Sequence, residues 1–504
     1  MTTQTESQDI LERLKTAQSK PLGDPRFRSL MGLEKSTFSE SNSASSGLTF
    51  YDLELGAKFL YPVMTPLRNA IPRVSGKGGI QASWRAITAI NTTGLRFGVS
   101  SANRGGVLAV ATQDYAANYK GIGVETSVDF EAQFAGQGFD DIRAIGAKTG
   151  LEALMIGEEA MILGGCSSAI AATPTPTLTA QTTGGALPAQ TWSIICAALT
   201  LDGLMNGSVA GGVQGSITRT NADGSTDTFG GGVAKKSANA TVATTGSTGL
   251  VNVTVAPVSG AMGYAWFWGA ANSEVLGAIT TINSLVVTAP ASGTQTAASL
   301  GASDNSANAL AFDGLIYQAT KPGSGATLYT MGTGSAGVGT GLTTDSAGGV
   351  MELDAVLKSM WDNYRLSPDT MWVSSQEALN ISRIIVKGSQ TAAQRFVFET
   401  AQDLIGGGIM VRTYLNRFSM QGGNVIDIRV HPNMPAGTIL LTTKTLPYPL
   451  AGVGNVIQIR TRQDYYQIEW PLRTRKYEYG VYSDQVLQNY FPPSMGLITN
   501  IGNV

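Results

Sequence analysis

The sequence predicts a mixed α+β fold into which a separate all-β domain is inserted. In the stretch 166–310, 8 of 145 residues are Asp, Glu, Lys or Arg, against 62 of the other 359. One long helical pattern precedes this stretch, and a mixture of helical and strand patterns follows it. The chain has 504 residues, which is more than a single core usually holds. We therefore expect a host fold and an insert.

The insert is expected to fold, because it contains aromatic side chains that linkers usually lack. They are Trp192, Phe229, Tyr264, Trp266, Phe267 and Trp268. Around Trp266, alternation places Tyr264 and Trp268 on the same face of a strand, and Ala265 and Phe267 on the other. Similar runs occur at 192–201, 251–257 and 282–289. Short strands at this spacing predict an antiparallel sandwich of immunoglobulin-like size, although no Cys-Trp-Cys framework is present.

The host begins with a charged and then Ser-rich arm that is too poor in apolar residues to form a core. Two alternating runs follow, at 80–90 and 122–130, with a Gly-rich stretch between them. They predict one long hairpin. A lone hairpin is marginally stable in water, so we expect its far end to lie on a neighbouring subunit.

One long helix should follow the hairpin. Asp140 and Asp141 can cap its first turn, and Gly164 with Gly165 can end it. Its length would be about 35 Å at 1.5 Å per residue. Beyond the insert, patterns predict a helix at 350–364, a strand at 371–373, and a helix begun by the capping box Ser374 and Glu377. The tail is expected to be nearly all strand, at 439–443, 456–461, 465–470 and 473–481.

Composition excludes several classes of protein. The net charge is -2, from 34 basic and 36 acidic residues, which argues against a dedicated nucleic-acid binder. No apolar run is long enough to span a membrane, and the first 20 residues do not form a signal peptide. We expect Cys166 and Cys196 to be buried free thiols, with a disulfide as the alternative, and we expect no metal or cofactor.

Catalytic chemistry is not expected. The single histidine, His431, is followed by Pro432, and no nucleophile motif accompanies it, so we interpret it as a turn or interface residue. The stretch 332–337 matches GxGxxG but opens no helix, which a phosphate cradle would require.

Two groups of residues are candidates for contacts between molecules. Arg96 and Arg104 at the hairpin tip, and Trp84 on its first strand, are candidate intersubunit contacts, although the arginines could simply keep the tip soluble. The only basic concentration consists of Arg460, Arg462, Arg473, Arg475 and Lys476. It could face DNA or a neighbouring subunit; the interpretation that we favour is ion pairing within the sheet, with Asp464, Glu469 and Glu478.

The order of these elements resembles the major capsid protein of tailed bacteriophages, the Hong Kong phage-type capsid fold shared with encapsulin shells. Three stretches look like family elements: Phe-Asp-Gly-Leu at 312–315, Trp-Val-Ser at 372–374, and the block from Tyr-Gln-Ile-Glu-Trp at 466–470 to Tyr482. The segment 258–268 is similar to immunoglobulin-like modules that some phage capsid proteins carry as insertions.

The resemblance implies a division of the chain into named parts. These are an N-terminal arm (1–52), the first part of the P-domain (53–78), the E-loop (79–132), the P-domain spine helix (133–165), the inserted immunoglobulin-like domain with its linkers (166–310), the A-domain (311–437) and the C-terminal strands of the P-domain (438–504).

The resemblance also implies a function. Hexamers and pentamers of the chain would form the icosahedral shell around the double-stranded DNA of a tailed phage, assembled in the cytoplasm of the host bacterium. Expected partners are a separate scaffolding protein, a portal, and as a further candidate a decoration protein. The insert would stand clear of the shell, so that a chain lacking 166–310 should still assemble. The alternatives are an encapsulin-like shell protein and a phage surface or tail adhesin. Lys77 and Lys120 flank the hairpin, but no cross-linking is expected.

Overall fold

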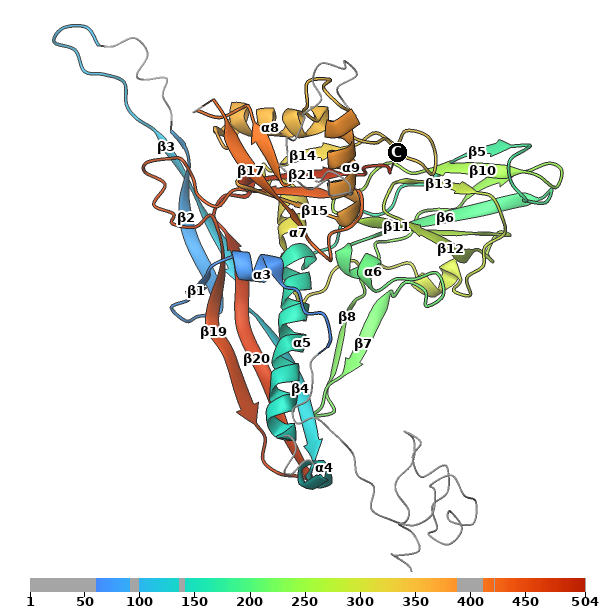
Figure 1. Ribbon diagram of the computed structural model, residues 1–504, viewed down its shortest axis with the longest axis horizontal. Coiled ribbons are helices and arrows are strands. Elements are labelled where there is room, and N and C mark those ends of the chain that lie inside the picture. The colour runs from blue at the N-terminus through green and yellow to red at the C-terminus, as the bar shows by residue number, and fades with distance from the viewer. Residues whose placement is uncertain (1–59, 91–98, 136–140, 388–410, 421, 504) are drawn as a thin grey trace, which may run out of the picture. The chain divides into compact units, whose positions relative to one another are not determined.

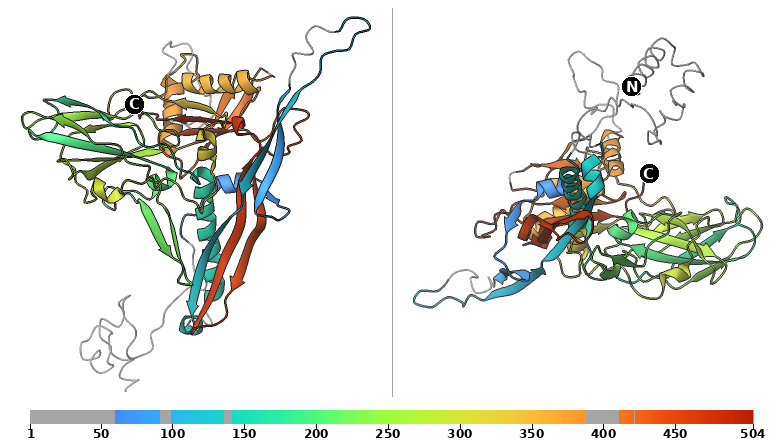
Figure 2. Two further views of the ribbon diagram at one scale, coloured as in Figure 1. Left: turned by 180° about the vertical axis from the view of Figure 1, so that it is seen from behind. Right: turned by 90° about the horizontal axis from the view of Figure 1, so that it is seen from below.

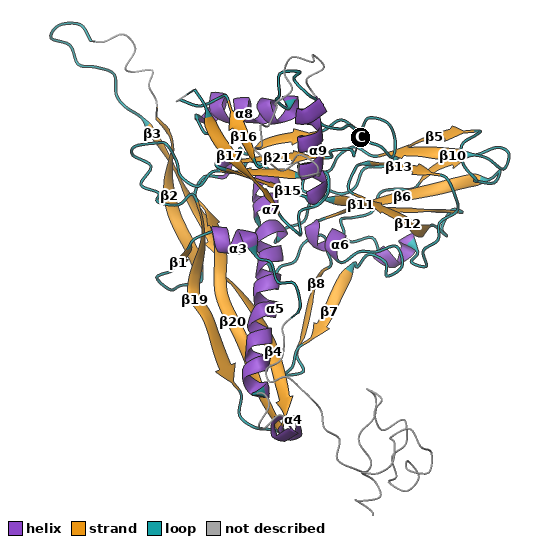
Figure 3. Ribbon diagram, viewed as in Figure 1, coloured by secondary structure: helices purple, strands orange, loops and turns teal. Residues whose placement is uncertain are grey.

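The computed structural model describes residues 60–90, 99–135, 141–387, 411–420 and 422–503 (Figures 1 and 3). The predicted arm (1–52), Arg96 and Asp140 lie outside the described residues. The described residues contain helices together with long runs of consecutive strands, so the predicted α+β class is confirmed.

The long helix α5 (Ile142–Gly164) packs against one face of a four-stranded sheet. The sheet order is β1 (Arg73–Ser75), β19 (Ile457–Glu469), β20 (Lys476–Asn489) and β4 (Lys120–Asp129). As predicted, the Asp141 carboxylate caps the helix, accepting from the backbone N–H groups of Arg143 and Ala144. Gly146 lets the helix approach the sheet closely, because a Cβ there would overlap the Tyr479 hydroxyl.

The hairpin has a different second strand from the one predicted. β2 (Gln81–Ile90) pairs antiparallel with β3 (Val110–Asn118), whereas the predicted partner at 122–130 is β4, which pairs with β20. The alternation in β4 comes from its contact with α5 on one face only. The sequence of β3 has no such alternation, because both of its faces are largely exposed.

The insert is a sandwich of two sheets. One contains β13 (Ser284–Val287), β10 (Leu250–Thr254) and β5 (Thr177–Gln181); the other contains β12 (Val275–Thr280), β11 (Gly263–Gly269), β6 (Thr191–Leu199) and β9 (Ala240–Ala243). A separate hairpin, β7 (Ser216–Thr220) with β8 (Thr226–Gly230), the short helix α6 (Leu201–Met205) and the 3₁₀ turn η3 (Ala297–Leu300) complete it. The predicted strands around 192–201, 251–257, 264–268 and 282–289 are thus confirmed.

Strand β11 is buried on both faces. Trp266 and Trp268 join the cluster between the two sheets, and Ala265 and Phe267 join a second cluster on the outer face of the four-stranded sheet, as the alternation predicts. The strand order differs from that of an immunoglobulin domain. When the seven strands of the two sheets are numbered in chain order, without the hairpin β7–β8, the first, fourth and seventh form the smaller sheet. A constant-type immunoglobulin domain unites its third, sixth and seventh strands instead.

The third part is an α/β lobe built on a six-stranded sheet. Its order is β14 (Thr327–Thr330), β21 (Met495–Thr499), β18 (Ile439–Thr442), β15 (Thr370–Val373), β17 (Asn424–Val430) and β16 (Thr413–Asn416). Its helices are α7 (Leu315–Thr320), α8 (Met351–Tyr364) and α9 (Ser375–Lys387). Ser374 caps α9 by accepting from the Glu377 N–H at 3.2 Å, but the Glu377 carboxylate turns away to accept from the Gly437 N–H. The predicted C-terminal strands therefore divide. The strand at 439–443 is β18 of this sheet, whereas those at 456–461 and 465–470 form the single strand β19, and that at 473–481 lies largely in β20, both in the sheet under α5. Strand β21 was not predicted.

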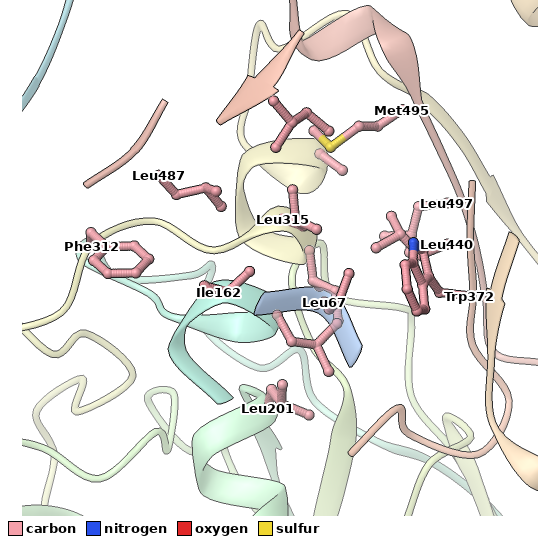
Figure 4. Packing of buried hydrophobic residues seen from close by; sticks show 14 of the residues in the cluster. Leu67, Ile162, Leu201, Phe312, Leu315, Trp372, Leu440, Leu487, Met495 and Leu497 are labelled. Carbon is pink, nitrogen blue, oxygen red and sulfur yellow. The ribbon is translucent and has the colours of Figure 1, made fainter. Parts of the chain in front are cut away.

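One apolar cluster joins all of these parts (Figure 4). It brings together buried side chains of α3 (Pro66–Ala70), α5, α6, α7 and the C-terminal strands. Its labelled members are Leu67, Ile162, Leu201, Phe312, Leu315, Trp372, Leu440, Leu487, Met495 and Leu497.

Candidate subunit interface

The hairpin β2–β3 exposes more apolar surface than a single folded chain normally leaves in water. The side chains are 46 to 89 % exposed: Ile80, Ile87, Ile90, Val99, Val107, Leu108 and Val110. Figure 2 shows the end of the hairpin extending beyond the elements on which its base packs. This arrangement agrees with the expectation that another molecule covers the hairpin.

Trp84 lies at the base of the hairpin, where the hairpin packs on its own chain. Its ring stacks on Tyr115 at 5.8 Å and meets the edge of Tyr490 at 5.6 Å. Its indole N–H is buried without an acceptor. Below it, Gln458 Nε2 donates to Gln488 Oε1 at 3.0 Å and to the Tyr490 hydroxyl at 3.2 Å. The packing at the base of the hairpin is thus partly polar. Of the other predicted contacts, Arg104 is exposed.

The predicted basic concentration is largely paired within the chain. Three of its members form ion pairs with acidic residues of neighbouring elements: Arg462 with Asp484 at 2.6 Å, Arg475 with Glu131 at 2.8 Å, and Lys476 with Asp129 at 3.3 Å. Ion pairing is therefore confirmed for them, but the predicted partners are wrong, since Asp464 pairs with Arg73 and Glu469 with Arg143. Arg473 is exposed in the turn between β19 and β20, and Arg460 is half-buried in β19.

A buried charge cluster on α5 was missed by the sequence analysis. Glu158 and Glu159 have no exposed surface, although the other buried residues of α5 are apolar or glycine. The signal in the sequence was the pair itself, because two adjacent carboxylates interrupt the otherwise uncharged and mainly apolar segment 154–163. Buried carboxylates require hydrogen-bond donors, and α3, β1, β19 and the turn after β17 supply them.

Glu159 takes the place of an N-cap side chain for α3. Its Oε1 accepts from the Leu67 N–H at 2.8 Å and its Oε2 from the Arg68 N–H at 2.7 Å, while Thr65 at the N-cap position provides no side-chain bond. His431 Nε2 lies 2.6 Å from the same Oε1. The Asn433 N–H donates to His431 Nδ1 at 3.1 Å, so Nδ1 is the acceptor and Nε2 carries the proton.

Glu158, the preceding residue of the helix, bonds to side chains of α3, β1 and β19. Arg73 Nη1 donates to its Oε1 at 2.5 Å, Arg68 Nε lies 3.2 Å from its Oε2, and the Tyr465 hydroxyl donates to Oε2. Burial, together with Glu158, raises the pKa of Tyr465 to about 12. The two adjacent carboxylates thus fix α3 and β1 to the long helix, and His431 joins the lobe to the same point.

The remaining residues singled out in the sequence have structural surroundings. His431 is 1 % exposed and bonded as described, in agreement with its interpretation as a turn residue. Cys166 and Cys196 are buried free thiols, as expected, and burial raises the pKa of Cys166 to about 12. The stretch 332–337 lies in a loop. In the described part of the chain no cluster of His, Cys, Asp and Glu could hold a metal, and no helix could cross a membrane.

Comparison with known proteins gave no matching family model and no matching curated protein. Solved structures do match. The capsid of a native GTA particle is 9% identical, with 93% of this chain and 100% of that chain covered and a TM-score of 0.41. The structure of Mycobacterium phage Bobi is 10% identical, with 90% of this chain and 95% of that chain covered and a TM-score of 0.39. The SrpI encapsulin of Synechococcus elongatus PCC 7942 is 9% identical, with 89% of this chain and 94% of that chain covered and a TM-score of 0.37. The first of these structures is a capsid and the third is an encapsulin complex.

Proposed function

We propose that this chain is the major capsid protein of a tailed bacteriophage, and that hexamers and pentamers of it form an icosahedral shell around double-stranded DNA. The observation that carries the proposal is the hairpin β2–β3, whose base packs on β20 while its apolar side chains remain exposed. Copies that cover each other's hairpins bury this surface, and closed point-group symmetry lets every copy do so equally.

The hairpin is joined to the body by short links. On one side Gly78 and Gly79 have φ values of 88° and 89° with open space around them, and on the other only Tyr119 separates β3 from β4. Such links allow the hairpin to follow the surface of an adjacent copy. The exposed Arg104 and Arg473 are the candidates for contacts beyond the chain, the first with another subunit and the second with a subunit or with DNA.

Electron microscopy and sedimentation velocity test the proposal on the purified chain, alone and with a co-expressed scaffolding protein. Closed shells are expected, and a chain that gives monomers under both conditions would refute it. Shells that contain cargo protein in place of DNA would favour an encapsulin-like compartment over a phage capsid.

A matched pair of variants tests the role of the hairpin. Val107→Asp places a charge on its most exposed apolar position, 89 % exposed, and should abolish shells without changing the unfolding of the monomer. Met205→Asp places the same charge on an apolar residue of the insert, 45 % exposed, and should assemble as the wild type does. Equal assembly of both variants would contradict the proposed interface.

A further inference from the structure

The insert is attached to the host at its root, where the chain enters and leaves it. The two crossing segments are held together, since the Asn308 N–H donates to the Cys166 carbonyl at 2.8 Å. A two-segment neck of this kind, taken alone, would let a domain swing.

The root is also part of the host core. Leu201 of α6 lies in the apolar cluster with Ile162, Phe312 and Leu315 (Figure 4), and a Cβ at Gly164 would overlap Leu201. Removing 166–310 would uncover this side of the host core. We therefore expect a chain lacking the insert to fold poorly, which would hinder its assembly.

A second attachment lies at the turn between β12 and β13. Here the Asn283 N–H donates to Asn500 Oδ1 at 2.9 Å, and Asn283 Nδ2 donates to Thr333 Oγ1 at 2.9 Å. Asn500 Nδ2 in turn donates to the Met331 carbonyl at 2.8 Å. Asn283 and Asn500 are 1 % and 6 % exposed, so these bonds are shielded from water.

The loop that receives this turn is the glycine-rich stretch that matches GxGxxG. The Gly337 N–H donates to Ser284 Oγ at 3.1 Å, and a Cβ at Gly337, whose φ is 72°, would come within 2.9 Å of Val286. Gly339, with a φ of 80°, lies beside Ile282. The glycines therefore permit a close approach of the insert, and this gives the motif a role that the phosphate-binding interpretation did not.

We propose that the insert is braced against the α/β lobe: the loop 332–339 and Asn500 form a socket for the turn 281–284, and this contact fixes the insert relative to the lobe. The root holds the insert to α5 and α7, and the socket holds it to the segments that follow β14 and β21. Two attachments on different host elements prevent the insert from swinging. The proposal does not depend on the assembly of a shell.

Two asparagines with positive φ provide the test. Asn500 (φ 63°) bridges the socket, whereas Asn272 (φ 65°) lies exposed in the turn before β12. Replacement by glycine suits the backbone at both positions, so Asn500→Gly removes the bridge and Asn272→Gly is its control. Thr333→Val deletes one of the two acceptors of the Asn283 amide and leaves the other, the Val255 carbonyl, in place, so it is a second and milder variant.

Hydrogen exchange of the full-length chain is the readout. Asn500→Gly should raise exchange at 282–284 and 333–339 about ten-fold over Asn272→Gly and leave β6 and β11 unchanged, because only the joint opens. Spin labels at Ser247→Cys in the insert and Ala355→Cys in α8 should show a broader distance distribution. Exchange in the socket equal to the control, an equal rise in β6 and β11, or an unbroadened distribution would overturn the brace.

Discussion

The buried carboxylate of Glu159 gives the sharpest prediction for stability. Its three neighbours all present hydrogens to it: the Leu67 N–H, the Arg68 N–H and His431 Nε2–H. Glu159→Gln keeps the size of the side chain but replaces one acceptor oxygen with an NH2 group. Whichever way the amide turns, that group faces at least one of these donors.

The cost follows from the bonds lost. One charge-assisted hydrogen bond contributes about 1.5 to 3 kcal/mol, and a buried donor left unsatisfied costs about 1 to 3 kcal/mol. Glu159→Gln should therefore lower the free energy of unfolding by about 3 kcal/mol. The assay is urea unfolding of the unassembled chain, followed by tryptophan fluorescence and extrapolated to water.

Glu131→Gln is the matched control, because Glu131 is 66 % exposed and its ion pair with Arg475 lies in solvent. It should cause no measurable change. If the free energy of unfolding of Glu159→Gln lies within about 1 kcal/mol of the wild-type value, well below the cost of a lost charge-assisted bond and an unsatisfied buried donor, the capping role assigned to the carboxylate is wrong.

Four further substitutions test other features. Gly157→Ala in α5 should stabilise the chain by about 0.5 to 1 kcal/mol in the same urea assay, because no atom lies near the added Cβ. Gly146→Ala should destabilise the chain, because its Cβ would overlap the Tyr479 hydroxyl. A loss of stability in both variants would contradict this reasoning. Trp84→Phe removes a buried indole N–H that has no acceptor, but also ring area that packs on Tyr115 and Tyr490, so the two effects should offset and leave the free energy of unfolding within about 1 kcal/mol of the wild type. A loss of about 3 kcal/mol would mean that the N–H is bonded. Burial raises the pKa of Glu377 above its ordinary value of 4.5, so its contribution to stability falls as the pH rises from about 4.5 through the raised pKa. In thermal unfolding between pH 4 and 8, the melting temperature of Glu377→Gln should therefore rise relative to that of the wild type as the pH increases through this window. Parallel curves of melting temperature against pH would contradict the shift.

Local patterns predicted several of the elements correctly. The helix α5, its cap Asp141 and the strand containing Trp266 were found in this way, because apolar spacing and capping chemistry are local. The second strand of the hairpin was assigned to 122–130 instead of β3. Alternation reports that one face is covered, but it does not report which strand lies alongside.

Contacts between distant segments could not be predicted from these patterns. Glu159 meets Leu67 and His431, which lie 92 and 272 residues away, and no periodicity marks such a meeting. The same holds for Asn283 and Asn500, 217 residues apart. The socket glycines were noticed, but their purpose depends on a turn that only the folded chain brings to them.

The central claim is that the hairpin β2–β3 obtains its stability from adjacent copies. Hydrogen exchange of its backbone amides, compared between the unassembled chain and purified particles, tests this most directly. We expect rapid exchange along 81–90 and 110–118 in the single chain and strong protection in the particle. Equal protection in both states would mean that the hairpin is stable by itself, which would contradict its stabilisation by adjacent copies.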